Sequence, residues 1–216
     1  MYLGDNILRE GIVDHTKKFK ENNHDASIML TEVENPDQFG IAELNNDGTL
    51  KRLIEKTKVP PSNLALVGIY FFKPVIMEAC KNINPSWRNE LEITDAIQWL
   101  IDSGYGVGWT KVEGWWKDTG KPEDILAANR LILDELTSRI KGEVMGEIRG
   151  RVAIYKGTKI NEKSVIKGPA LIWRDCIIKD SYIGPYTSIG NKCAIINSAV
   201  EDSVVMDGAK LVFSTV

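Results

Sequence analysis

Isoleucine recurs at a fixed spacing through the C-terminal third of the 216-residue chain. The spacing is six residues, with a single five-residue step, and the positions are Ile160, Ile166, Ile172, Ile178, Ile183, Ile189 and Ile195. Four positions after most of them lies a small residue, and these are Ser164, Ala170, Cys176, Thr187, Cys193 and Ala199. This period is typical of a parallel β-helix, in which three hexads form one triangular coil and the aliphatic side chains point inward. We therefore expect residues 142–216 to form a β-helix of hexapeptide repeats, incomplete because the repeat is still running at the last residue.

Residues 1–141 instead alternate strand patterns with helical ones, which predicts an α/β domain. Residues 39–44 and 49–54 flank the turn sequence Asn-Asp-Gly and predict a hairpin. Residues 64–72 are nearly all apolar and predict a strand that is buried on both faces. Leu8, Ile12 and Phe19 fit one face of a helix. The domain boundary is expected at 141/142, where the helical pattern ends.

The composition excludes several classes of protein. The net charge is −3 and no basic cluster is present, which argues against a partner that is nucleic acid or a membrane surface. The longest apolar stretch, residues 65–72, is too short to span a bilayer, and the first residues do not resemble a signal peptide. Three cysteines without metal-type spacing favour a reduced, cytoplasmic setting.

Two aspartates follow predicted strands at positions where α/β sheets bind ligands. Asp5 lies in the segment Tyr-Leu-Gly-Asp-Asn, and Asp118 lies in Trp-Trp-Lys-Asp-Thr-Gly. If both strands end at one edge of the sheet, the two carboxylates converge on a hard divalent cation, and Mg²⁺ prefers a few carboxylates with water and substrate phosphates. The alternatives are a turn aspartate for Asp5 and a helix cap for Asp118.

Six segments together resemble the sugar-1-phosphate nucleotidyltransferases, and most closely the glucose-1-phosphate thymidylyltransferase branch in its long form. In chain order they are YLGDN, FGIAEL, LIEK, PPSNLALVGIY, RNELEITDAI and WWKDTGKPEDILAAN. The resemblance implies a Rossmann-like nucleotide-diphospho-sugar transferase domain, present here in part, followed by a left-handed parallel β-helix. It also implies Mg²⁺-dependent transfer from dTTP to glucose 1-phosphate, which yields dTDP-glucose and pyrophosphate.

The resemblance also implies a set of site residues. Asp5 and Asp118 match the Mg²⁺ ligands, Glu55 matches the residue that holds sugar hydroxyls, and Lys56 matches the residue that contacts the sugar phosphate. The residues that match positions around the sugar are Gly40, Gly68, Tyr70 and Trp116, and Arg88 matches a phosphate-contacting arginine. From the residues alone, Tyr70 fits a core position, Arg88 fits a surface ion pair with Glu90 or Glu92, and the adjacent Glu55 and Lys56 should face opposite sides of their strand.

The chain departs from the family at two points. The family's opening segment, G-x-G-T-R-x-x-P-x-T, has no counterpart, and Thr57 stands where a proline is usual. The missing segment wraps the nucleotide phosphates with backbone N–H groups and an arginine. We therefore expect an N-terminally truncated chain that retains contacts to the sugar phosphate and metal but is inactive alone.

Other readings of the sequence remain open. The chain could transfer a uridylyl or adenylyl group, or it could be a non-catalytic sugar-phosphate sensor or regulatory subunit that forms a homo-oligomer through its β-helix. Acyl transfer by the β-helix is disfavoured because the hexads contain no histidine to act as a base.

Overall fold

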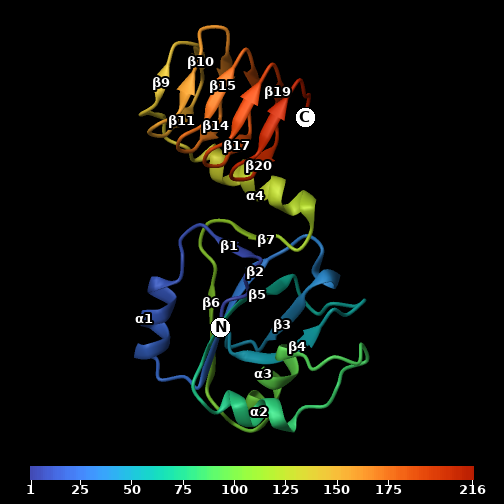
Figure 1. The fold of residues 1–216 in the computed structure, drawn as a ribbon. Coiled ribbons are helices and arrows are strands. Elements are labelled where there is room, and N and C mark those ends of the chain that lie inside the picture. The colour runs from blue at the N-terminus through green and yellow to red at the C-terminus, as the bar shows by residue number, and fades with distance from the viewer. The chain divides into compact units, whose positions relative to one another are not determined.

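A computed structural model describes all residues of the chain, Met1–Val216, and they form two compact units (Figure 1). The first unit is Met1–Asp118 and the second is Thr119–Val216. The first is an α/β unit and the second is built on a parallel β-helix, so the predicted fold class is confirmed. No helix of the chain is both long and apolar enough to cross a membrane.

The first unit is built on a five-stranded mixed sheet in the order β4-β3-β5-β2-β6. Its strands are β2 (Ala26–Glu32), β3 (Gly40–Leu44), β4 (Leu50–Glu55), β5 (Leu64–Phe72) and β6 (Val107–Lys111). Only β2 and β6 pair in parallel, and β3 and β4 form the hairpin that the Asn-Asp-Gly turn predicted. The central strand β5 is buried on both faces, because its consecutive residues Leu66 and Val67 face opposite sides of the sheet and belong to different core clusters.

Helices cover both faces of this sheet. On one face, α2 (Ile76–Asn82) and α3 (Ile93–Asp102) bury Ala79, Ala96 and Leu100 against Ala26 of β2. On the other face, α1 (Val13–Glu21) places Phe19 against Phe71 of β5, with ring centroids 5.8 Å apart. A short 3-10 helix (Pro36–Gln38) precedes β3.

The helix expected to include Leu8 begins later than the pattern predicts. Leu8 lies in a strand, β1 (Asn6–Leu8), and α1 starts at Val13. Between them Gly11 has φ +70°, a left-handed conformation that an α-helix does not continue through. Pairing of β1 with another strand therefore overrides the helical periodicity at Leu8.

A two-stranded antiparallel ribbon completes the first unit. It joins β1 to β7 (Trp116–Asp118), with Asn6 opposite Asp118 in the register. The preceding residues run alongside β5, where the Leu3 N–H donates to the Gly68 carbonyl at 2.8 Å. The ribbon is thereby fastened to the central strand of the sheet.

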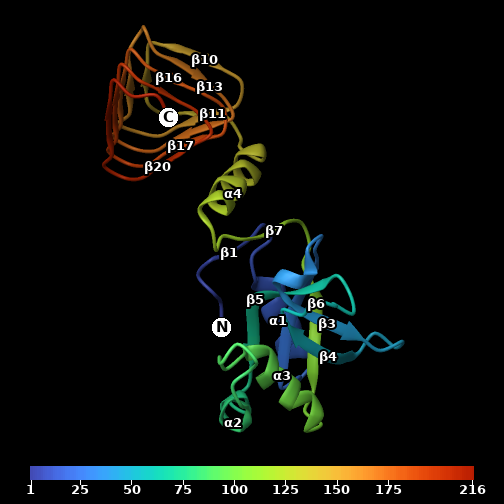
Figure 2. The same cartoon turned by 90° about the vertical axis from the view of Figure 1, so that its right-hand side faces the viewer.

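Three parallel sheets form the sides of the β-helix in the second unit, and Figure 2 shows the coils with a three-sided outline. The first side has β8 (Arg139–Ile140), β11 (Val152–Ile154), β14 (Ala170–Ile172), β17 (Thr187–Ile189) and β20 (Val204–Val205). The second has β9 (Glu143–Val144), β12 (Lys159–Ile160), β15 (Ile177–Lys179), β18 (Ala194–Ile196) and β21 (Lys210–Val212). The third has β10 (Glu147–Arg149), β13 (Val165–Lys167), β16 (Tyr182–Ile183) and β19 (Ala199–Val200). The periodic isoleucines fill the interior, and each is at most 1% exposed.

Serine hydroxyls connect successive coils at one corner of the β-helix. The Ser181 N–H donates to Ser164 Oγ at 3.3 Å, the Ser198 N–H to Ser181 Oγ at 3.1 Å, and the Ser214 N–H to Ser198 Oγ at 3.1 Å. Each hydroxyl satisfies a backbone donor that would otherwise be unpaired inside the corner.

The helix α4 (Pro122–Asp134) packs with the β-helix. Asn129 donates to the Tyr186 carbonyl at 2.8 Å and accepts from the Ser188 hydroxyl at 2.5 Å, and Arg130 pairs with Asp202. These contacts explain why the packing boundary falls between Asp118 and Thr119. The domain boundary predicted at 141/142 was placed where the helical sequence pattern ends, which is a different criterion from packing. That boundary stays a prediction.

Replacing Ser181 by alanine should lower the free energy of unfolding by about 1–3 kcal/mol, because the buried Ser198 N–H loses its acceptor. Urea unfolding followed by circular dichroism would measure this. The control is Ser203→Ala, whose hydroxyl bonds only at the surface and whose loss should cost less than about 0.5 kcal/mol. Equal effects of the two variants would contradict the role assigned to the corner hydroxyls.

Candidate functional site

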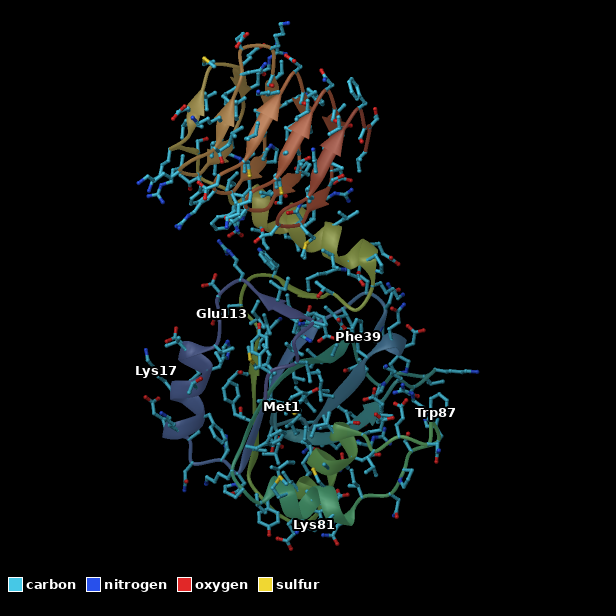
Figure 3. The ribbon with its side chains drawn as sticks, in the orientation of Figure 1. Met1, Lys17, Phe39, Lys81, Trp87 and Glu113 are labelled. Atoms are coloured by element: carbon cyan, nitrogen blue, oxygen red, sulfur yellow. The ribbon has the colours of Figure 1, made fainter.

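A pocket of about 200 Å³ in the first unit collects most of the predicted site residues. It is lined by Leu3, Asp5, Asn6, Gln38, Phe39, Gly40, Glu55, Lys56, Leu66, Gly68, Tyr70, Glu92, Ile93, Thr94, Trp116 and Asp118. Of the residues predicted from the sequence, only Arg88 does not line it. Phe39, labelled in Figure 3, packs edge-on against Trp116 with ring centroids 5.5 Å apart.

The β1–β7 ribbon brings the two predicted metal-binding aspartates together. Asp118 lies opposite Asn6 in the antiparallel register, and Asp5 immediately precedes Asn6. Both side chains line the same pocket. No group of three or more histidine, cysteine or acidic side chains gathers as a complete metal site. Two carboxylates with water and phosphate oxygens are nevertheless a usual donor set for Mg²⁺, so these residues fit that ion.

The Asn6 side chain holds this arrangement together, although its place in the sequence did not predict a site residue. Its amide oxygen accepts from the Gly68 N–H at 3.0 Å and from the Trp116 indole N–H at 2.7 Å. Its amide nitrogen donates to Asp5 Oδ1 at 2.8 Å. Two donors at the oxygen and one acceptor at the nitrogen fix the orientation of the amide. Asn6 thus links β1, β5 and β7 and orients the Asp5 carboxylate.

Two glycines allow these close contacts. A Cβ atom on Gly68 would lie 2.5 Å from Asn6 Nδ2, and a Cβ atom on Gly40 would lie 2.8 Å from Thr94 Cγ2 and 3.0 Å from Glu55 Oε2. Such distances are shorter than a methyl group tolerates. Gly40 and Gly68 therefore serve the pocket by leaving space for the side chains that line it.

Glu55 and Lys56 both line the pocket although they are adjacent. In a regular strand they would face opposite sides, as the sequence suggested. Lys56 has φ +39°, a left-handed conformation that is uncommon for a residue with a side chain, and its N–H donates to the Phe39 carbonyl at 3.1 Å. The chain turns at this point, which removes the strand alternation and gives the pocket both a carboxylate and an ammonium group.

Arg88 lies beside Glu55, outside the pocket lining. Its guanidinium is 2.9 Å from Glu90, 3.3 Å from Glu92 and 3.8 Å from Glu55. The ion pairs with Glu90 and Glu92 agree with the alternative reading of the sequence. The phosphate contact that the resemblance implies for Arg88 stays a prediction.

Burial changes the acidity of two groups in the pocket. Desolvation, together with the nearby charge of Glu92, raises the pKa of Glu55, although the Thr94 hydroxyl bonds to it at 3.2 Å. Desolvation also raises the pKa of Tyr70 to about 12, so its phenol is neutral. Tyr70 belongs to the core cluster and also lines the pocket, so the two readings of this residue are compatible.

Several lining residues carried no separate signal in the sequence. Glu92 is buried and accepts from the Ser86 hydroxyl at 2.9 Å, and Thr94 bonds Glu55 from the start of α3. Both belong to the segment ELEITD, where polar residues directly before a helical stripe were a usable signal. The sequence signal for Asn6 was weaker, since an asparagine next to a buried strand is also an ordinary turn residue.

Comparison with known proteins identifies the family. Residues 1–135 match the family described as nucleotidyl transferase. The chain therefore belongs to the nucleotidyl transferase family, which confirms the family that the sequence motifs predicted.

Individual relatives extend this similarity along the chain. It is 47% identical over 209 residues to glucose-1-phosphate thymidylyltransferase of Streptomyces antibioticus, which covers 95% of this chain and 58% of that protein. It is equally similar, over the same shares of both proteins, to the low-salt glycan biosynthesis nucleotidyltransferase Agl11 of Haloferax volcanii. A solved structure described as a putative glucose-1-phosphate thymidylyltransferase from Bacillus anthracis matches with a TM-score of 0.56 and 33% identity, covering 64% of this chain and 55% of that one. The chain thus spans somewhat more than half the length of the curated relatives.

Asn6→Ala should lower the free energy of unfolding by about 1–3 kcal/mol, since the buried Gly68 N–H and the Trp116 indole lose their acceptor. Urea unfolding would measure the loss, and the indole N–H resonance of Trp116 in a ¹⁵N spectrum should shift. The exposed Asn84→Ala is the control and should change neither. An unshifted resonance in Asn6→Ala would contradict the proposed network.

The raised pKa of Glu55 predicts a pH dependence of stability. Over a range above the ordinary value of 4.5, the folded chain keeps a proton on this carboxyl that the unfolded chain has released. This group's contribution to the free energy of unfolding therefore falls as the pH rises through that range.

Urea unfolding at a series of pH values should show that Glu55→Gln removes this fall. Glu43→Gln is a control of opposite sign, because Lys51 and Arg52 hold the pKa of Glu43 below its usual value. A Glu55→Gln profile parallel to that of the unsubstituted chain would refute the prediction.

Proposed function

We propose that this chain supplies the sugar-phosphate and metal contacts of a sugar-1-phosphate nucleotidyltransferase that acts on glucose 1-phosphate and dTTP. The observation that supports this most directly is the lining of one pocket by Asp5, Asp118, Glu55 and Lys56. Family membership and the names of the relatives point to the same class of reaction.

Two charged groups and two aromatic rings of the pocket contact the sugar phosphate in this proposal. The Lys56 ammonium pairs with the phosphate of the sugar, which it can reach because it is exposed at the turn after β4. The Glu55 carboxylate accepts hydrogen bonds from sugar hydroxyls, with its second oxygen held by Thr94. Trp116 is fixed by Asn6 and forms one wall with Phe39.

The metal in this proposal is Mg²⁺, with Asp5 and Asp118 as its protein ligands. When bound, the ion would neutralise phosphate charge and align the attacking and leaving groups. Asn6 holds the Asp5 carboxylate in place before the ion arrives, so less reorientation is needed on binding.

The proposal also specifies which nucleotide is the substrate. The Streptomyces antibioticus relative is named for thymidylyl transfer, which supports dTTP as the nucleotide. UTP is the alternative nucleotide substrate, and its turnover is to be compared with that of dTTP. The 216-residue polypeptide, tested alone, is expected to bind glucose 1-phosphate without rapid turnover, because its pocket offers one lysine and no Gly-rich loop for a triphosphate.

Calorimetric titration with glucose 1-phosphate in the presence of Mg²⁺ tests the binding part. Lys56→Ala should weaken binding about tenfold or more, as expected for the loss of a charge-assisted contact. Lys58→Ala, which removes an exposed lysine that does not line the pocket, should leave the affinity unchanged. Absence of binding, or equal losses in the two variants, would overturn the proposal.

Release of pyrophosphate with dTTP or UTP tests turnover. Little release is expected from the 216-residue polypeptide with either nucleotide. Rapid release would contradict the expected inactivity while supporting the reaction class, and a preference for UTP would overturn the assignment of the base.

A further inference from the structure

Besides the pocket of the first unit, the β-helix carries a groove with an excess of positive charge. It has a volume of about 780 Å³ and is lined by Arg139, Lys141, Glu143, Tyr155, Lys156, Gly157, Arg174 and Asp175. These residues come from successive coils at the beginning of the β-helix, where Figure 3 shows nitrogen-tipped side chains extending outward. No residue of the pocket around Asp5 and Asp118 contributes to it.

Four of the lining side chains are cations without an acidic partner. Arg139, Lys141, Lys156 and Arg174 form no ion pair or side-chain hydrogen bond, and Glu143 instead pairs with Lys159 at 3.5 Å. The basic residues therefore outnumber the acidic ones in a chain whose net charge is −3. Unpaired charges of one sign along a groove attract ligands of the opposite sign.

The coil register places two of these cations side by side. The pairing of Ile154 with Ile172 continues to Lys156 and Arg174, and the Asp175 N–H donates to the Lys156 carbonyl at 3.2 Å. Neighbouring strands are about 4.8 Å apart, so the two basic side chains start close together and repel. An anion with several oxygens, such as a phosphate chain, would bridge them and relieve that repulsion.

An aromatic pair borders the same corner. The rings of Tyr155 and Trp173 are stacked with centroids 4.5 Å apart and an interplanar angle of 23°. Trp173 is 37% exposed, and Tyr155 lines the groove itself. A flat aromatic surface beside unpaired cations matches the two parts of a nucleotide, because bases stack on aromatic rings and phosphates pair with lysine and arginine.

We propose that this groove is a second ligand site, which takes a nucleotide with two or more phosphates. The phosphates lie against Lys141, Lys156 and Arg174, and the base lies on the Tyr155–Trp173 pair. A volume of several hundred Å³ is the usual size of a site for a ligand of this size. The proposal does not depend on the function proposed for the first unit.

Titration of the whole 216-residue chain with ATP in Mg²⁺-free buffer tests the site, with tryptophan fluorescence as the signal. We expect saturable quenching that is lost in Trp173→Phe, and an affinity for ATP above that for adenosine or inorganic triphosphate alone. Inorganic triphosphate that binds as tightly as ATP would overturn the role of the base.

A matched pair of double variants tests the cations. Lys141→Ser with Lys156→Ser should weaken ATP binding about tenfold or more, since two charge-assisted contacts are lost. Lys163→Ser with Lys167→Ser removes the same charge from exposed positions outside the groove and should change the affinity less than about twofold. Equal losses in the two pairs would show unspecific attraction and overturn the proposal.

Lys56→Ala and added glucose 1-phosphate distinguish the groove from the pocket in the first unit. Neither should change the ATP affinity if the nucleotide binds on the β-helix. Loss of ATP binding in Lys56→Ala would place the nucleotide in the other pocket and refute the second site.

Discussion

The amide of Asn6 is the contact on which the pocket geometry depends. It joins three strands through hydrogen bonds to Gly68, Trp116 and Asp5, and it is nearly inaccessible to solvent. A buried amide whose oxygen accepts two hydrogen bonds is costly to displace, because movement would leave the Gly68 N–H and the Trp116 indole N–H without their acceptor. The ribbon that contains Asp118 and directly follows Asp5 is short, so the Asn6 side chain gives it a fixed position against β5.

A second constraint is the turn at Lys56. Strand alternation would send one of two adjacent charged residues away from the pocket, and the positive φ at Lys56 brings both to the same place. Such conformations cost free energy and persist where the surroundings enforce them. Here the hydrogen bond to Phe39 supports the turn, and Phe39 in turn packs on Trp116. The turn and the wall of the pocket thus stabilise each other.

The sequence predicted the architecture well because its strongest signals are local. The six-residue period, the Asn-Asp-Gly hairpin and the apolar run of β5 each act within a few residues, and the structure contains all the corresponding elements. Leu8 was misassigned because pairing with Trp116, far along the chain, outweighs its helical spacing. Asn6 was missed for the same reason, since its partners lie 62 and 110 residues away. Most of the predicted site residues do line one pocket. Predicting them required the resemblance to a family, because the residue pattern alone left their roles open.

The ladder of serine hydroxyls has a consequence for how the β-helix can change in length. Ser164, Ser181 and Ser198 are separated by a constant number of residues, and each offers the same acceptor to the coil that follows it. Every coil therefore presents nearly the same surface above and below, as in other solenoids. Duplication or loss of one whole coil would preserve contacts of this kind. The register also tolerates coils of slightly different length, since Val152 pairs with Ala170, Ala170 with Thr187 and Ser188 with Val204. Such a module is suited to lengthening or shortening by repeats during evolution without disturbing the unit that carries the pocket.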